Sequence, residues 1–156
     1  MTSTTVIAPV KGRAVALADV PDPVFSGGMV GYGAAIDPPR QVVDAVAPVS
    51  GKILKLLPHA YVIMTADNVG VLVHLGLDTV QLNGAGFTTH VAQGDTVTAG
   101  QPIITYDVPA IIAAGMSPIV PVVVMDERDP ANVTVSEAVT AGAGIVTGAT
   151  LFTANK

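Results

Sequence analysis

Turn-forming residues divide this chain into short apolar runs, and their spacing constrains the fold more than any other feature. Gly, Pro, Asp and Asn recur roughly every eight to twelve residues. Between them lie valine-rich runs such as 70–75 and 119–124. Short β-branched runs bounded by turn residues are typical of strands. We therefore predict an all-β fold: a compact antiparallel β-sandwich, or a barrel-sandwich-hybrid-like domain, with short helical turns.

The pattern predicts twelve strands and one segment with helical potential, Val108–Ala114. The run from Pro118 to Met125 is not predicted to be helical, because Pro118 and Pro121 interrupt it. The predicted strands are Thr5–Ala8, Gly12–Ala16, Gly31–Ile36, Gln41–Ala45, Gly51–Leu56, Ala60–Thr65, Gly70–Leu75, Phe87–His90, Pro102–Tyr106, Ile119–Val124, Gly144–Val146 and Leu151–Ala154.

Two weak internal repeats indicate quasi-equivalent halves. The segment 6–12 resembles 46–51, and 94–103 resembles 142–151. Each member of the later pair has glycines six residues apart. A glycine–strand unit that occurs twice suggests a sandwich or barrel rather than a solenoid, because the repeats are too short to stack.

The size and charge of the chain exclude several classes of function. A chain of 156 residues is long enough to bury a core, so 1–156 is predicted to form a single domain. The net charge is −5, and the seven Lys and Arg residues are spread along the chain. Without a basic patch we expect no nucleic-acid binding. A mildly acidic, apolar surface suits a basic protein partner instead.

No segment of the sequence is predicted to enter or cross a membrane. The most apolar stretch, 110–125, is broken by Gly115, Pro118 and Pro121, whereas a span needs about 20 apolar residues. The N-terminus lacks the basic and apolar regions of a signal peptide. The chain has no cysteine, so it forms neither disulfides nor thiolates. We therefore expect a cytoplasmic protein.

Two of the three histidines frame one predicted hairpin. His59 lies fifteen residues before His74, and turn residues lie between them. If Ala66 and Asp67 form a two-residue loop, the ladder places His59 opposite His74. Directly opposed residues share one face, with Cβ atoms roughly 4.5–5.5 Å apart.

An imidazole in such an apolar setting is a core residue, a metal ligand or a nucleophile. Two neighbouring imidazoles among apolar residues favour the neutral form, and a neutral ring nitrogen is a good nucleophile toward phosphorus. A structural zinc site needs four ligands. With no cysteine, only Asp, Glu or His90 could join His59 and His74, so we expect no intrinsic metal and no cofactor. Neither a Gly-x-Ser-x-Gly elbow nor a nucleotide-binding P-loop is present.

The string from His74 to Phe87, His-Leu-Gly-Leu-Asp-Thr-Val-Gln-Leu-Asn-Gly-Ala-Gly-Phe, resembles the signature of glucose-type enzyme IIA proteins. These belong to the bacterial phosphoenolpyruvate-dependent sugar phosphotransferase system. The resemblance covers nearly the whole chain, from Ile7-Ala8-Pro9 to Thr150-Leu151. It implies a phosphotransferase component that carries a phosphoryl group for sugar uptake.

The resemblance also implies roles for individual residues. His74 would accept the phosphoryl group on Nε2, and His59 would stabilise it. Asp22 and Asp78 would flank the site with negative charge. Many relatives have threonine where Leu57 stands, two residues before the second histidine. The implied apolar docking patch consists of Val24, Phe25, Val30, Leu72 and Val80.

The implied partners are the phosphocarrier protein HPr as donor and a cysteine of a IIB domain as acceptor. A regulatory module that binds other proteins according to its phosphorylation state is a second interpretation. A lipoyl- or biotinyl-type carrier is a third, but none of Lys11, Lys52, Lys55 and Lys156 lies in the hairpin-tip context that such a carrier needs. The sugar, and whether the chain is free-standing or fused to a permease, stay open.

Overall fold

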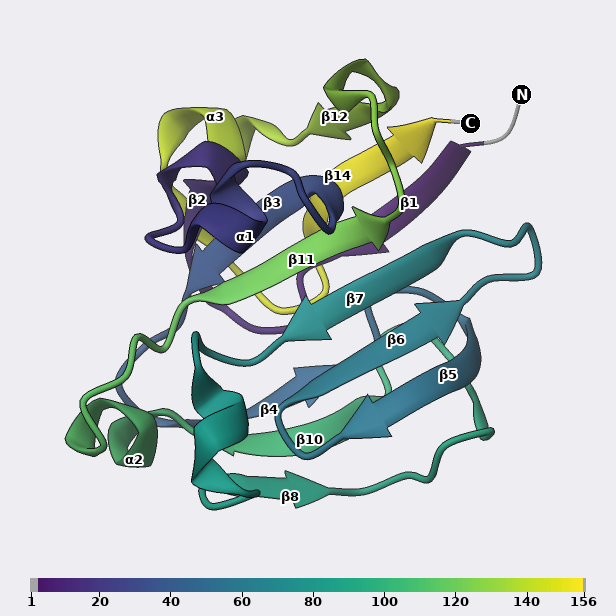
Figure 1. Ribbon diagram of the computed structural model, residues 1–156. Coiled ribbons are helices and arrows are strands. Elements are labelled where there is room, and N and C mark those ends of the chain that lie inside the picture. The colour runs from purple at the N-terminus through teal and green to yellow at the C-terminus, as the bar shows by residue number, and fades with distance from the viewer. Residues whose placement is uncertain (1–2, 156) are drawn as a thin grey trace.

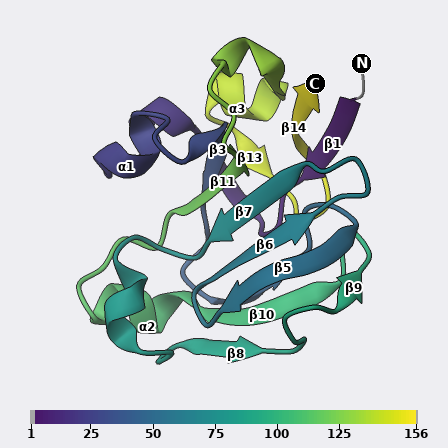
Figure 2. The same ribbon diagram turned by 45° about the vertical axis from the view of Figure 1, so that its right-hand side comes forward.

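The predicted all-β class is confirmed by a computed structural model, which describes residues 3–155 (Figures 1 and 2). Residues 1, 2 and 156 of the predicted domain lie outside the described part. Within residues 3–155, all strand pairings are antiparallel and form three sheets. The described helices are short, and none of them is long and apolar enough to cross a membrane.

The largest sheet has eight strands in the order β13-β2-β3-β11-β7-β6-β5-β9. Its strands are β2 (Gly12–Ala16), β3 (Gly31–Asp37), β5 (Gly51–Leu57), β6 (Ala60–Met64), β7 (Gly70–His74), β9 (Thr96–Val97), β11 (Val120–Met125) and β13 (Gly144–Ile145). The smaller sheets have the orders β1-β14-β12 and β4-β10-β8. Their strands are β1 (Ser3–Ile7), β4 (Val42–Val46), β8 (Phe87–Thr89), β10 (Pro102–Asp107), β12 (Val133–Val135) and β14 (Thr150–Asn155).

Each of the twelve predicted strands is present, with ends within two residues of the prediction. Two strands were not predicted, β9 and β12, and each is only two or three residues long. Such short strands carry no periodicity that a sequence pattern can detect.

The helical segments are short, and an aspartate side chain caps the start of three of them. The predicted helical segment forms α2 (Val108–Ala113), where Asp107 Oδ1 accepts a hydrogen bond from Ala110 N. The helices α1 and α3 were not predicted. The remaining helical segments are α1 (Pro23–Ser26), α3 (Glu137–Ala141) and the 3₁₀ turns η1 (Leu17–Asp19), η2 (Thr79–Leu82) and η3 (Pro130–Asn132).

The two sequence repeats make equivalent hydrogen bonds. Gly100 N donates to Ala47 O over 2.9 Å, and Gly148 N donates to Ala8 O over 3.0 Å. The short pairings β5–β9 and β2–β13 occupy matching places in the two halves. Both glycines have positive φ, 92° and 91°, which glycine adopts without strain. The repeats are therefore quasi-equivalent, as predicted.

Two apolar clusters position the candidate site. The main core runs through the sheets from Val6 to Ala154. A second cluster packs η1 and α1 against the large sheet and includes Phe25, Leu77 and Val123. In Figure 1, α1 lies beside β3 and β11, on the side where β7 ends at its arrowhead.

The predicted register of the β6–β7 hairpin is wrong by one residue. Thr65 N donates to Val69 O over 3.0 Å, so the loop has three residues, 66–68, rather than two. Asn68 has φ 63°, the left-handed residue that commonly completes a three-residue hairpin loop. As a result Ala60, not His59, pairs with His74.

Candidate functional site

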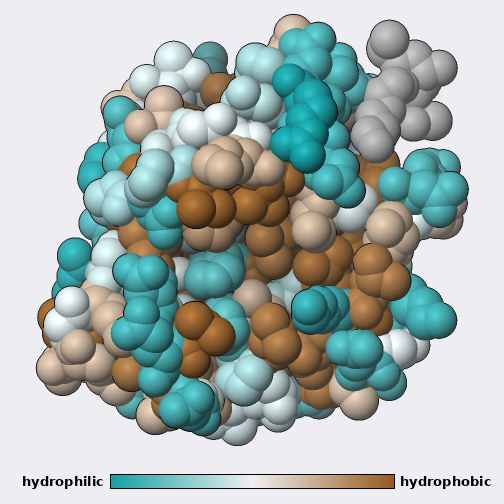
Figure 3. All heavy atoms as spheres, in the orientation of Figure 1, coloured by the Kyte–Doolittle hydropathy of each residue, from teal (hydrophilic) through white to brown (hydrophobic). Residues whose placement is uncertain are grey.

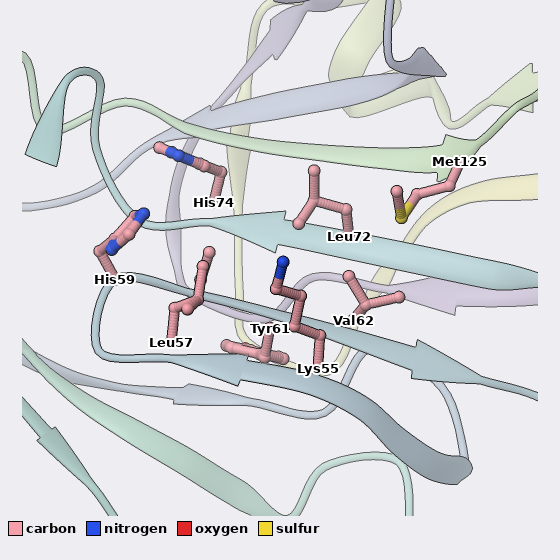
Figure 4. A pocket seen from close by; sticks show the side chains of 9 residues that line it. Lys55, Leu57, His59, Tyr61, Val62, Leu72, His74 and Met125 are labelled. Carbon is pink, nitrogen blue, oxygen red and sulfur yellow. The ribbon is translucent and has the colours of Figure 1, made fainter. Parts of the chain in front are cut away.

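The two histidines nevertheless lie side by side. Their ring centroids are 5.0 Å apart, and the rings meet edge to face at 71° (Figure 4). His74 is the last residue of β7, whereas His59 lies in the two-residue turn Pro58–His59 between β5 and β6. Leu75 N donates to His59 O over 2.7 Å and ties this turn to the end of β7. The expected proximity is therefore present, but a turn residue and not a cross-strand pair provides it.

A backbone carbonyl fixes the tautomer of His74. His74 Nδ1 lies 2.6 Å from Gly76 O. Because a carbonyl oxygen only accepts hydrogen bonds, Nδ1 must carry the proton and donate it. In the neutral ring, Nε2 then keeps its lone pair. The site therefore leaves Nε2 of His74 unprotonated in the neutral ring.

The turn after His74 holds that carbonyl in place. Gly76 has φ 84°, and Gly76 N donates to Ile119 O over 3.1 Å. The fully buried Thr79 donates from Oγ1 to Leu75 O over 2.8 Å. A Cβ at Gly76 would lie only 2.6 Å from Thr79 Cγ2, so this turn accommodates glycine alone without a shift.

Burial keeps both imidazoles neutral near pH 7. Loss of hydration lowers the pKa of His59, and repulsion from His74 lowers it further. Loss of hydration also lowers the pKa of His74, although the Gly76 hydrogen bond and the charges of Asp22 and Asp78 act in the opposite direction. Neutral rings are the form that can attack phosphorus.

The two predicted acidic residues lie at neighbouring turns. Asp22 precedes α1, and its Oδ1 accepts a hydrogen bond from Val24 N over 2.9 Å. Asp78 precedes η2 with φ 61°, a conformation that Asp tolerates better than most residues. Both carboxylates raise the pKa of His74 through their charge. The structure therefore brings them within electrostatic reach of His74.

The five predicted docking residues differ in exposure. Phe25 is buried, and its ring centroid lies 5.3 Å from that of His74. Val30 and Leu72 are half-buried and pack in the same cluster as Phe25. Val24 and Val80 are exposed, by 44% and 59%. Figure 3 shows apolar side chains gathered on this face of the molecule.

A pocket beside the histidines contains residues that were not predicted for the site. Its lining comprises Lys55, Leu57, His59, Ala60, Tyr61, Val62, Leu72, His74 and Met125 (Figure 4). Lys55 was missed as a site residue, and its side chain extends from β5 toward β7. Lys55 lies two residues before Leu57, so strand alternation was the available signal.

His59 and His74 are the only His, Cys, Asp or Glu residues among the described residues that line the pocket. Within residues 3–155, no group of three or more His, Cys, Asp or Glu side chains is placed to hold a metal ion. The third histidine, His90, instead bonds through Nε2 to Thr105 Oγ1 over 2.6 Å. Two ligands do not complete a structural zinc site.

Fold and site together define an all-β domain in which one histidine with an unprotonated Nε2 lies among apolar side chains. The family described as phosphoenolpyruvate-dependent sugar phosphotransferase system, EIIA 1, matches residues 4–129. The glucose-specific EIIA component of Oceanobacillus iheyensis is 39% identical over 143 residues, which span 88% of this chain and 85% of that protein. The glucosamine-specific EIICBA component of Bacillus subtilis is 45% identical over 121 residues, which span 76% of this chain and 19% of that protein.

The solved structure of glucose permease IIA from Mycoplasma capricolum shares the fold with a TM-score of 0.85 and 32% identity, covering 98% of this chain and 96% of that one. The chain belongs to the EIIA 1 family of the sugar phosphotransferase system. It is therefore a phosphotransferase component and a phosphoryl carrier, as the sequence resemblance implied. HPr is the usual donor in this family, and homologues occur alone or fused to IIBC components, consistent with a IIB partner.

Proposed function

We propose that His74 Nε2 accepts the phosphoryl group from phospho-HPr and passes it to a cysteine of a IIB domain. The hydrogen bond from His74 Nδ1 to Gly76 O carries this proposal, because it leaves Nε2 unprotonated. Among the described histidines, His90 has an exposed side chain and bonds through Nε2 to Thr105, and His59 has no such bond to fix its tautomer. This difference supports His74 as the acceptor.

The transfer requires one bond to form as another breaks. The Nε2–phosphorus bond of His74 forms while the phosphorus–nitrogen bond of phospho-HPr breaks, and the electron pair of that bond stays on the histidine of HPr. Phosphoryl transfer passes through a loose transition state in most analyses, so positioning and electrostatics matter more than acid–base chemistry. The thiolate of IIB then takes the group from His74 in the same way.

His59 would stabilise the phosphoryl group by hydrogen bonding. The ring of His59 lies beside His74, and a neutral imidazole carries one N–H donor. Because Leu57 is apolar, His59 has no hydroxyl from that position to orient it. The apolar surroundings would exclude water and so slow hydrolysis of the phosphohistidine.

The surface around His74 would receive both partners. Val24, Phe25, Val30, Leu72 and Val80 would form its apolar part. Asp22 and Asp78 would meet positive charge on the donor, which favours rapid association and brief encounters.

Within this function we also propose a single domain over 1–156, since one core runs from Val6 to Ala154. We propose a cytoplasmic location, because the family draws its phosphoryl groups from phosphoenolpyruvate.

A reconstituted mixture of phosphoenolpyruvate, enzyme I and HPr tests the assignment. We expect His74→Ala to abolish labelling of the protein. We expect His59→Gln to accept the phosphoryl group but to transfer it slowly to IIB. His90→Ala is the matched control, because His90 is exposed and bonds to Thr105 away from the pocket. Labelling of the His74→Ala protein on histidine would contradict the proposal, and a panel of IIB partners would identify the sugar.

A further inference from the structure

The ring of His59 is held by packing and not by hydrogen bonds. Ring hydrogen bonds join His74 to Gly76 and His90 to Thr105. None joins the ring of His59 to another residue within the described chain. His59 is nevertheless 93% buried, since only 7% of it is exposed. Another contact must therefore fix its orientation.

Phe87 is the second aromatic ring that lies beside His59. The ring centroids of His59 and Phe87 are 6.5 Å apart, and the rings are tilted by 60°. This edge-to-face geometry falls within the range that stabilises aromatic pairs. The centroid of His74 lies 5.0 Å from that of His59. His59 thus contacts one aromatic ring besides that of His74.

Phe87 is itself fixed by Tyr106. The two residues are directly paired between β8 and β10, and their rings stack at 5.5 Å with an angle of 16°. Tyr106 is fully buried, and its hydroxyl donates to Pro118 O over 2.9 Å. A Cβ at Gly76 would lie 3.1 Å from the same hydroxyl, so Tyr106 also supports the turn that holds His74. This aromatic pair therefore contacts His59 through Phe87 and the turn after His74 through Tyr106.

The segment before Phe87 closes over the turn that carries His59. Gly84 has φ 93°, and a Cβ there would lie 3.6 Å from two carbons of Pro58. Phe87 N donates to Gly84 O over 3.2 Å, and Asp107 N donates to Gly86 O over 2.9 Å. The chain from η2 to β8 thus passes close to Pro58 and is hydrogen-bonded to β10.

We propose that Phe87 is a positioning residue that orients His59 for phosphoryl transfer, with Tyr106 as its support. The inference rests on the proposed function of His74 and His59 and adds a residue that acts through its contact with His59. Packing against Phe87 takes the place of a hydrogen bond at position 57, where this chain has leucine. A ring held in this way stays in place while its N–H is free for the phosphoryl oxygens.

The test compares acceptance from phospho-HPr with onward transfer to IIB in Phe87→Ala. We expect acceptance within about twofold of the unmodified protein and onward transfer slower on the order of 10-fold, because small displacements of a positioned group reduce rates strongly. In NMR titrations the pKa of His59 should rise toward its ordinary value, since the ring loses burial. Phe87→Leu removes the ring but keeps an apolar side chain, which protects the fold. Phe87→Tyr keeps the ring, so onward transfer and the pKa of His59 should both stay as in the unmodified protein.

Two controls separate positioning from general destabilisation. Phe152→Leu alters a fully buried phenylalanine in β14 and should change neither the ratio of the two rates nor the pKa of His59. In a His59→Gln background, Phe87→Ala should have no further effect on onward transfer, because the two residues act through one contact. Equal losses in both transfer steps, an additive double variant or an unchanged pKa of His59 would overturn the inference. Failure of the unmodified protein to be labelled on His74 would instead overturn the proposed function.

Discussion

A substitution at Gly76 gives the sharpest prediction about the site, because it should change both the free energy of unfolding and the tautomer of His74. Gly76→Ala places a methyl group 2.6 Å from Thr79 Cγ2 and 3.0 Å from Ser117 O. It also forces alanine into φ 84°, which costs about 1–2 kcal/mol for a residue with a Cβ. Overpacking of a well-packed site costs a further ~1–3 kcal/mol. We therefore expect a loss of about 2–5 kcal/mol in the free energy of unfolding.

Gly100→Ala is a matched control for the backbone part of this cost. Gly100 has φ 92°, but a Cβ there would have no heavy atom within 4 Å. Gly100→Ala should therefore lower the free energy of unfolding only by the conformational cost, about 1–2 kcal/mol. Urea denaturation of both variants measures the difference, which isolates the steric contribution at Gly76.

The second expected consequence of Gly76→Ala is a change in the tautomer of His74, which the ring nitrogens report. Displacement of Gly76 O weakens the bond that holds the proton on Nδ1. Nitrogen-15 chemical shifts should therefore show a mixture of tautomers in Gly76→Ala and a single Nδ1–H tautomer in Gly100→Ala. Equal stability losses in the two variants, or an unchanged tautomer in Gly76→Ala, would refute the reasoning.

Three further predictions follow from the same contacts. Burial lowers the pKa of His59 and His74 in the folded protein, so the unfolded chain binds protons first as the pH falls below the ordinary value of 6.5. The free energy of unfolding should therefore decrease between about pH 7.5 and pH 5.5 in urea titrations, and His59→Gln should reduce this decrease; an equal decrease in both proteins would contradict it. Asp22→Asn keeps a residue that can cap α1 but removes a charge that raises the pKa of His74, so NMR titration should show that pKa lower still, and a rise would count against the assignment. Thr79→Val should destabilise the fold by about 1–3 kcal/mol, because Leu75 O loses its buried donor; a loss below that measured for the exposed Thr98→Val would show that the hydrogen bond is dispensable.

The sequence predicts the strands well because each apolar run ends at a residue with a distinct turn preference. It fails at the β6–β7 register, where the loop length depends on Asn68 adopting a left-handed conformation. Asn-Val-Gly in the sequence does not reveal which residue takes that conformation. The histidines still meet, because His59 lies in a turn whose backbone bonds to Leu75.

The environment of the histidines is harder to predict than their proximity. Phe87 reaches His59 only because the chain from Thr79 to Gly86 folds back through positive-φ residues and pairs with β10. Lys55 lies two residues before Leu57 on a regular part of β5, so alternation points to Lys55 only once Leu57 is known to line the pocket. The contact of Phe87 depends on tertiary closure and not on local pattern.

The ring nitrogen that receives the phosphoryl group tests the central claim most directly. Phosphorus and nitrogen-15 NMR of the protein after incubation with phosphoenolpyruvate, enzyme I and HPr identifies that atom. The account predicts a single phosphohistidine with the phosphorus on Nε2 of His74, because Nδ1 donates to Gly76 O. Phosphorus on Nδ1 of His74, or on His59, would contradict it.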